Sequence, residues 1–310
     1  MRRIIKRALE LGVVRSGLAS ARRATGVQKA VILAYHNVVP SHDRPMGDSS
    51  LHLPIDEFRI QLDLLEGRFA LVPVDHLLSG DLDTDEPVVA ITFDDAYRGS
   101  LELGIAELNS RGHPAMVFVP PGLLGEAGFW WDLLSEEDSG GVRPDVRDFA
   151  LETLGGKQEA VLQWASSLGR GGRELPDLYR PADEEEVLEV AGQDGISLGS
   201  HTWNHVSLTA VSAAEAQVEL RKPIDWLAGL PSSRKVKRCL EVISYPYGKW
   251  NPSLDSLTRE AGYGSGFLVQ GGVTNLEAIR SRPFSISRLN IPRGLSPEGF
   301  LARVSGVWPR

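Results

Sequence analysis

Short apolar runs recur along the chain, and each ends at polar or turn-forming residues. Most of them have the length and the β-branched content of buried strands. The runs cover residues 31–35, 88–93, 116–119, 196–198, 242–245, 266–269 and 284–287. The pattern therefore predicts about seven strands.

Stretches with helical periodicity lie between these strands. Residues 55–65, 101–108 and 213–227 repeat apolar positions at the spacing of one helix face. Alternating strands and helices indicate a parallel sheet that is closed or wound by helices. About seven strands fit one barrel of the TIM type or an incomplete version of it, and a doubly wound open sheet is the alternative. No glycine-rich phosphate fingerprint follows the first strand, which argues against nucleotide binding.

Residues 129–190 interrupt the alternation of strands and helices. They hold an aromatic cluster, a loop rich in Gly, Asp and Pro, helical segments and an acidic run at 183–186. We interpret the stretch as a helical insertion beside the barrel mouth. The acidic run is typical of a helix N-terminus, where the helix dipole favours negative charge.

The composition is that of an ordinary globular protein, but the charge is unevenly distributed. The formal net charge of −8 argues against a general nucleic-acid binder. Residues 1–26, in contrast, hold seven basic residues and one acid, Glu10. We expect residues 1–28 to form a basic amphipathic helix and residues 29–310 to form the barrel. This helix either rests on an anionic membrane surface or packs over the bottom of the barrel.

The chain contains neither a convincing signal peptide nor a run of apolar residues long enough to span a membrane. The expected location is therefore the cytoplasm. If the basic helix rests on a membrane, residues 1–26 would add a peripheral membrane contact.

Reactive side chains stand at the ends of the predicted strands, where a barrel of this kind forms its active site. Asp94 and Asp95 end one strand, and His201 and His205 follow another. On a helical turn the spacing of four would direct both imidazoles to one side. Two histidines and a carboxylate suit a divalent metal, while the second aspartate stays free as a base. The alternative is that the aspartates cap the next helix and the histidines are structural.

Three short motifs resemble those of the polysaccharide deacetylase family, also called the NodB-homology or carbohydrate esterase 4 family. TFDD at 92–95 and HTWNH at 201–205 are similar to its first two motifs, and YPYG at 245–248 is similar to the third. The similarity covers about residues 30–295. It implies an irregular (β/α)7 TIM-like barrel and a metal-dependent activity that removes N-acetyl groups from sugars.

The resemblance also implies roles for individual residues. Asp95, His201 and His205 would hold a divalent metal, often zinc, and Asp94 would be the general base. The backbone N–H of Tyr247 would help to stabilise the oxyanion.

Two departures from the family pattern concern the remaining catalytic groups. Many members supply the general acid from a late Leu-x-His motif, but no histidine follows His205 here. The third motif usually begins with an arginine that orients the base, and Ser244 occupies that position. Arg288 is the candidate to orient Asp94 instead. His36, at the end of the first strand, is the candidate acid, and the alternative is a histidine that only packs there.

Flat aromatic faces suit sugar rings because they bury apolar C–H surface. Trp203, between the two histidines, Tyr245 of the third motif and Trp131 of the insertion are therefore candidate substrate-binding residues. For the tryptophans, packing at the edge of the core is the alternative.

These features predict a metal-dependent hydrolase that removes an N-acetyl or similar N-acyl group from an amino sugar. The expected substrate is a carbohydrate, which is part of a polysaccharide, a glycolipid or a glycan precursor. The expected metal is zinc. One alternative is a catalytically inactive carbohydrate-binding relative, which the two departures would suit. The other is a non-heme Fe(II) oxygenase, whose site has the same ligand types but usually lies on another fold.

Overall fold

The computed structural model of the chain describes residues 29–44, 46–84, 86–136, 140–230 and 236–307. The predicted N-terminal helix at 1–28 lies outside the described residues. Among those that are described, no helix is long and apolar enough to cross a membrane.

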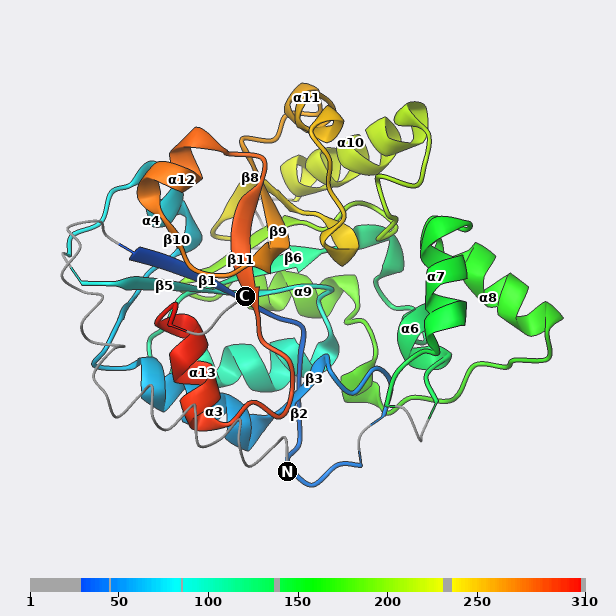
Figure 1. Cartoon of the computed structure of the whole chain (residues 1–310), viewed down its shortest axis with the longest axis horizontal. Coiled ribbons are helices and arrows are strands. Elements are labelled where there is room, and N and C mark those ends of the chain that lie inside the picture. Colours follow the sequence, from blue (N-terminus) through cyan, green and yellow to red (C-terminus); the bar gives the residue numbers. More distant parts are fainter. Residues whose placement is uncertain (1–28, 45, 85, 137–139, 231–235, 308–310) are drawn as a thin grey trace.

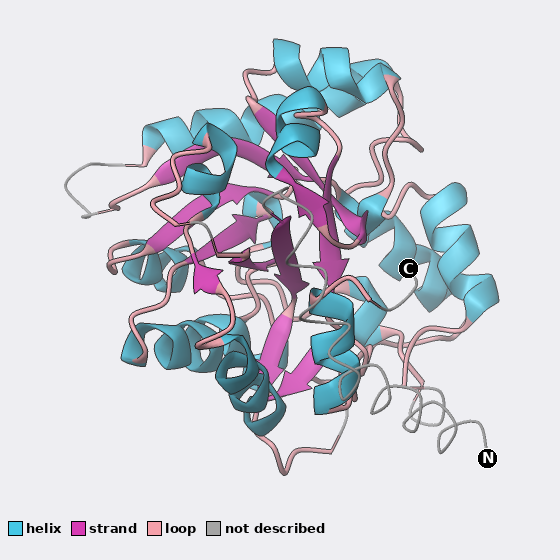
Figure 2. Cartoon of the chain, turned by 60° about the vertical axis from the view of Figure 1, so that its left-hand side comes forward, coloured by secondary structure: helices cyan, strands magenta, loops and turns pink. Residues whose placement is uncertain are grey.

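Seven parallel strands form a closed barrel (Figures 1 and 2). The first strand pairs with the last and also with the second strand of the barrel, which closes the sheet on itself. The barrel strands are β1 (Lys29–Tyr35), β5 (Val88–Phe93), β6 (Ala115–Val119), β7 (Ile196–Ser200), β8 (Cys239–Ser244), β9 (Ser265–Gly271) and β11 (Ile286–Asn290). Each lies on or next to one of the seven predicted runs, so the predicted barrel is confirmed.

The strands read as continuous apolar runs because both of their faces are buried. Val31, Leu33 and Tyr35 of β1 pack outward against the helices, and the Tyr35 ring lies 5.2 Å from the ring of Phe58. The alternate residues face the barrel interior, where Phe118 and Phe267 meet at 5.5 Å from strands that are not neighbours. Apolar side chains of different sizes, from Ala90 to the two phenylalanines, fill this part of the interior.

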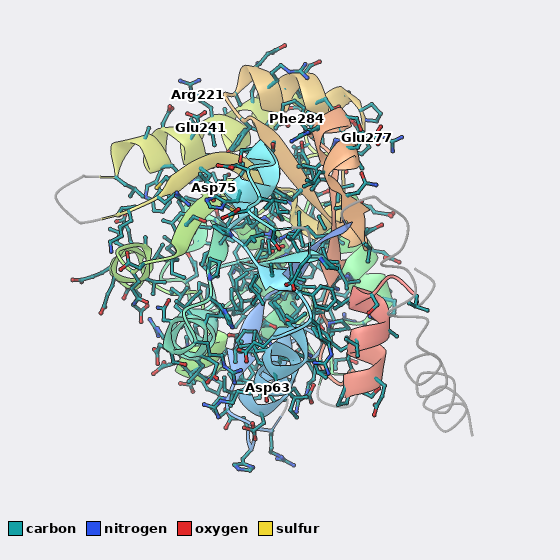
Figure 3. The ribbon with its side chains drawn as sticks, turned by 90° about the vertical axis from the view of Figure 1, so that its left-hand side faces the viewer. Asp63, Asp75, Arg221, Glu241, Glu277 and Phe284 are labelled. Atoms are coloured by element: carbon teal, nitrogen blue, oxygen red, sulfur yellow. The ribbon has the colours of Figure 1, made fainter. Side chains whose placement is uncertain are left out.

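Helices surround the barrel, as Figure 2 shows. They are α3 (Ile55–Leu65), α4 (Val74–Ser79), η2 (Ser100–Ile105), α5 (Ala106–Ser110), α6 (Trp130–Leu133), α7 (Pro144–Glu152), α8 (Gln158–Ser167), α9 (Glu184–Ala191), α10 (Ala213–Gly229), α11 (Ser253–Glu260), α12 (Leu276–Ser281) and α13 (Pro297–Val304). The smaller elements are β2 (Asn37–Val39), β3 (His52–Pro54), β4 (Ala70–Leu71), β10 (Thr274–Asn275), η3 (Pro121–Leu123), η4 (Asp177–Tyr179) and η6 (Pro246–Gly248). Charged side chains of the outer helices, such as Asp63, Arg221 and Glu277, lie at the periphery (Figure 3).

The stretch predicted as an insertion divides into two parts. Helices α6, α7 and α8 stand together beside the barrel (Figure 1) and share an apolar cluster that includes Trp130, Ala150 and Val161. Helix α9 packs on the barrel itself, since Val187 and Ala191 belong to the same core as β6 and β7. The acidic run begins α9 as predicted, with a reciprocal capping box between Asp183 and Glu186.

Candidate metal centre and catalytic site

Side chains that follow β5 and β7 converge at the carboxyl-terminal mouth of the barrel. Oδ1 of Asp95 lies 3.3 Å from Nε2 of His201 and 3.0 Å from Nε2 of His205. The two Nε2 atoms are 3.1 Å apart. All three side chains are buried, so three potential ligand atoms point at one another inside the protein.

This cluster fits a bound divalent cation. Its candidate ligand atoms lie within 4.8 Å of one another. Oδ1 of Asp95 is buried and makes no hydrogen bond within the described part of the chain, and an unsatisfied buried carboxylate oxygen is costly. Burial alone would raise the pKa of Asp95, but the electrostatic influence of the facing His205 and His201 outweighs burial and lowers it. Two imidazoles and one carboxylate are typical of a catalytic zinc site.

The tautomer of His201 is fixed by its other ring nitrogen. Nδ1 lies 2.7 Å from the carbonyl oxygen of Ser244 and donates its proton there. In the neutral imidazole, Nε2 therefore keeps a lone pair directed at the cluster, which is what metal ligation requires.

The backbone around the cluster is strained. Among the described residues other than glycine, a positive φ occurs at Asp95 (72°), Ala96 (54°), Thr202 (61°), His205 (54°) and Tyr247 (59°). Four of them lie within the three sequence motifs, and Ala96 directly follows the first motif. Such conformations persist only where the surrounding structure enforces them, and they concentrate at functional sites.

The helical turn predicted for residues 201–205 is wrong. The segment is a loop, and its positive φ angles at Thr202 and His205 bring the imidazoles together. A spacing of four is compatible with both geometries.

Asp94 belongs to a polar group inside the barrel that also contains Arg288 and Ser244. Arg288 donates to both carboxylate oxygens of Asp94, over 2.8 Å to Oδ1 and 2.7 Å to Oδ2. The Ser244 hydroxyl lies 3.2 Å from Oδ2 and accepts a further hydrogen bond from Arg288 over 2.6 Å. Burial raises the pKa of Asp94, but the Arg288 charge and hydrogen bonds outweigh burial and lower it.

Strand alternation explains why these polar side chains meet. The residues with even numbers in β5, β8 and β11 face the barrel interior, as Ala90, Val242 and Ile286 do. The same alternation directs Asp94 and Arg288 inward. Ser244 stands where the motif resemblance led us to expect an arginine, and the guanidinium here comes from Arg288 of a later strand, which the serine hydroxyl joins.

His36 and Tyr247 lie at the rim of the site. His36 is half-buried at the end of β1, and it lies close enough to Asp94 to contribute electrostatically to the lowered pKa of that carboxyl. The ring of Tyr247 lies 4.7 Å from that of His205, and its hydroxyl accepts a hydrogen bond of 3.0 Å from Trp130. The structure thus brings both residues close to the cluster of Asp94, Asp95, His201 and His205.

The predicted sugar-binding aromatic residues are placed differently from one another. Trp131 is 3% exposed and its ring lies 4.7 Å from that of His205, so it packs behind a candidate ligand. Trp203 is half-buried and its indole lies close to Gly122 and beneath Lys222, whose Nζ is 5.4 Å from the ring centre.

Tyr245 is placed away from the site. It is 1% exposed, and its hydroxyl pairs with Thr258 of α11 at 3.2 Å. Because Ser244 faces inward, the next residue faces the outer helices, and a substrate at the barrel mouth does not reach it.

A buried hydrogen-bond chain that no sequence pattern predicted supports the site from the insertion side. The Tyr97 hydroxyl donates to Oδ2 of Asp132 over 2.6 Å and accepts from Nε1 of Trp131 over 2.8 Å. Oδ1 of Asp132 lies 3.0 Å from Nε2 of His52. Tyr97 closely follows the strained turn at Asp95, so one hydroxyl connects that turn with the ring behind His205. No spacing rule links these residues in the sequence.

A closed α/β barrel with paired acids after one strand and paired histidines after another defines a class of barrel hydrolases. The sequence profile of the polysaccharide deacetylases matches residues 81–266, which is more than half of the chain. The protein therefore belongs to the polysaccharide deacetylase family, as its motifs predicted.

Several known proteins are similar to this chain in sequence or in fold. The YxkH protein of Bacillus subtilis (strain 168), whose name refers to the same family, is 22% identical over 283 residues, which cover 90% of this chain and 77% of that protein. The structure of the Streptococcus pyogenes deacetylase PplD in complex with acetate has a TM-score of 0.57 at 20% identity, covering 90% of this chain and 99% of that one. The structure of a polysaccharide deacetylase from Bacillus cereus has a TM-score of 0.61 at 15% identity, covering 90% of this chain and 69% of that one. These structures share the barrel fold.

Proposed function

We propose that the protein is a metal-dependent hydrolase that removes an N-acetyl or similar N-acyl group from an amino sugar. The observation that carries the proposal is the position of Asp94 beside the Asp95, His201 and His205 cluster. Oδ2 of Asp94 lies 3.9 Å from Nε2 of His201. A proton acceptor thus stands next to a candidate metal site without belonging to it.

Asp95, His201 and His205 are the residues that would hold the cation, and their ligand types favour zinc. Bound there, a divalent metal supplies a water of lowered pKa and polarises the acyl carbonyl. The chain contributes the buried surroundings of the cluster, which strengthen electrostatic interactions at the site.

Asp94 is the general base in this proposal. It accepts a proton from the attacking water, and it is ionised at neutral pH because Arg288 lowers its pKa. The two parallel hydrogen bonds from Arg288 fix the plane of the carboxylate. Arg288 therefore acts as a positioning residue, in the role that the third motif usually assigns to its own arginine.

The oxyanion and the leaving amine need two further groups. We assign the backbone N–H of Tyr247 as a hydrogen-bond donor to the oxyanion. An amine leaves readily only after it gains a proton, and His36 is the acid that we assign to this step. Its support is its place at the rim, within electrostatic range of Asp94.

Two substitutions test the proposal. Asp95→Ala and His201→Ala should each abolish stoichiometric zinc binding and release of acetate from N-acetylated amino sugars. His76→Ala is the matched control, because His76 is exposed on α4. Acetate release that survives both substitutions and a chelator would overturn the proposal.

A further inference from the structure

We propose that Glu219 of α10 is a positioning residue that holds the loop of His201 and His205 in its metal-binding conformation. The inference rests on the proposed function, because it takes these histidines as metal ligands. Glu219 does not touch them. It acts on the two residues between them, Trp203 and Asn204.

The Glu219 carboxylate is buried and accepts several hydrogen bonds from this loop. Oε2 accepts from the backbone N–H of Trp203 over 3.0 Å and from that of Asn204 over 2.7 Å. Oε1 accepts from the side-chain amide of Asn204 over 2.8 Å. Glu219 itself is 5% exposed. A carboxylate is rarely buried without donors, and here the described donors all come from the histidine loop.

The backbone carbonyl of Glu219 makes a further contact with the loop. It also lies within hydrogen-bond distance of the Trp203 N–H, at 3.1 Å. Within a regular helix this carbonyl would accept from the residue four positions on, but that residue is Pro223, which has no N–H. The proline inside α10 therefore leaves the Glu219 carbonyl available to the loop.

The loop needs such an anchor because its own backbone is strained. Thr202 and His205 both have positive φ angles, of 61° and 54°, which residues other than glycine rarely adopt unless the surrounding structure enforces them. The barrel side supplies a second anchor, since Gly122 donates its N–H to the Trp203 carbonyl over 2.8 Å. A side chain at Gly122 would collide with Trp203 and Asn204. Trp203 and Asn204 are thus held between η3 and α10, and His201 and His205 are positioned on either side of them.

The sequence carries a signal for this role. Ala216, Leu220, Pro223 and Leu227 form the buried stripe of α10, and Glu219 lies on the same face. An acidic residue on an apolar helix face indicates a buried partner, and the partner here is a loop that bears two candidate ligands.

Three variants of α10 test the proposal. Glu219→Leu keeps much of the side-chain volume but removes both acceptor oxygens. Glu219→Gln keeps one acceptor oxygen for the backbone N–H groups. Its new amide N–H can donate to the side-chain oxygen of Asn204 once the Asn204 amide has turned over. Gln217→Ala is the control, because Gln217 is exposed on the same helix.

Two readouts separate positioning from packing. The first is amide hydrogen exchange of residues 200–206 in the zinc-free proteins. The second is the dissociation constant for zinc, together with the visible spectrum of the cobalt-substituted proteins, which reports ligand geometry. We expect faster exchange, zinc binding weakened by on the order of tenfold or more, and an altered cobalt spectrum in Glu219→Leu. Glu219→Gln and Gln217→Ala should resemble the unaltered protein.

A folded Glu219→Leu protein with unchanged zinc affinity and cobalt spectrum would overturn the proposal, even if its exchange were faster. If Glu219→Leu does not fold, Glu219→Asp replaces it, because the shorter carboxylate no longer reaches both backbone N–H groups, and the same outcomes apply. If the unaltered protein and Gln217→Ala bind no zinc, the proposed function itself fails, and the role of Glu219 fails with it.

Discussion

The guanidinium of Arg288 spans both carboxylate oxygens of Asp94, at 2.8 and 2.7 Å, from the opposite end of the sequence. Both side chains are buried in the barrel, and Ser244 bridges them. A buried carboxylate paired in this way is held ionised and in one orientation, as a general base requires.

The pH profile of activity should depend on this pair. Without Arg288, burial remains and raises the pKa of Asp94, so the carboxylate becomes protonated at a higher pH. In Arg288→Lys the charge is kept but the paired hydrogen bonds are lost. We expect the acid limb of kcat/KM to move to higher pH in Arg288→Lys and further in Arg288→Met. Acid limbs that coincide with that of the unaltered protein would show that Arg288 does not govern Asp94.

The contribution of His36 to the reaction rate should be larger for a poor leaving group than for a good one. For an N-acetyl sugar, His36→Gln should lower kcat by about 10²-fold or more, because the amine must be protonated as it leaves. An activated acetate ester has a good leaving group, so its hydrolysis should change little. Comparing both substrates in the same variant measures the effect. An equal loss for amide and ester would instead indicate that His36 only shapes the site.

Removal of one hydroxyl should loosen the insertion side of the site. Tyr97→Phe deprives buried Asp132 of its shortest donor and Trp131 of its acceptor. The expected loss is about 1–3 kcal/mol in the free energy of unfolding, measured by denaturant titration. Tyr179→Phe is the control, since the one hydrogen bond that its hydroxyl makes among the described residues is a 3.5 Å contact with the Arg44 carbonyl. Equal stability of the two variants would contradict the importance of the Tyr97 hydrogen bonds.

The barrel was predictable because strands buried on both faces produce short continuous apolar runs. The ends of these runs also located Asp94, Asp95 and His201, since parallel strands in a barrel end at the same mouth. Residues 55–65 form α3 as predicted, because their apolar positions share one face. The family motifs then added the assignment of Asp95, His201 and His205 as potential ligands.

Other features depend on contacts between distant segments. The histidine loop is not helical because Glu219 and Gly122 hold it in a conformation that its own sequence does not specify. The side chains of Ser244 and Tyr245 are adjacent in the sequence and point to opposite faces of the sheet. The position of β8 in the barrel decides which of them faces the interior. Trp131 is hidden behind His205 because α6 folds back onto the barrel mouth, which composition alone does not indicate.

The most direct test of the central claim is acetate release from N-acetylated amino sugars by zinc-reconstituted protein. Formate release from N-formyl sugars extends the screen. The account predicts one free amine per acetate, loss of activity with a chelator and recovery with zinc, and no activity in zinc-loaded Asp94→Asn. A folded, zinc-loaded protein that binds these sugars tightly but releases neither acetate nor formate would contradict the account and identify a carbohydrate-binding protein instead.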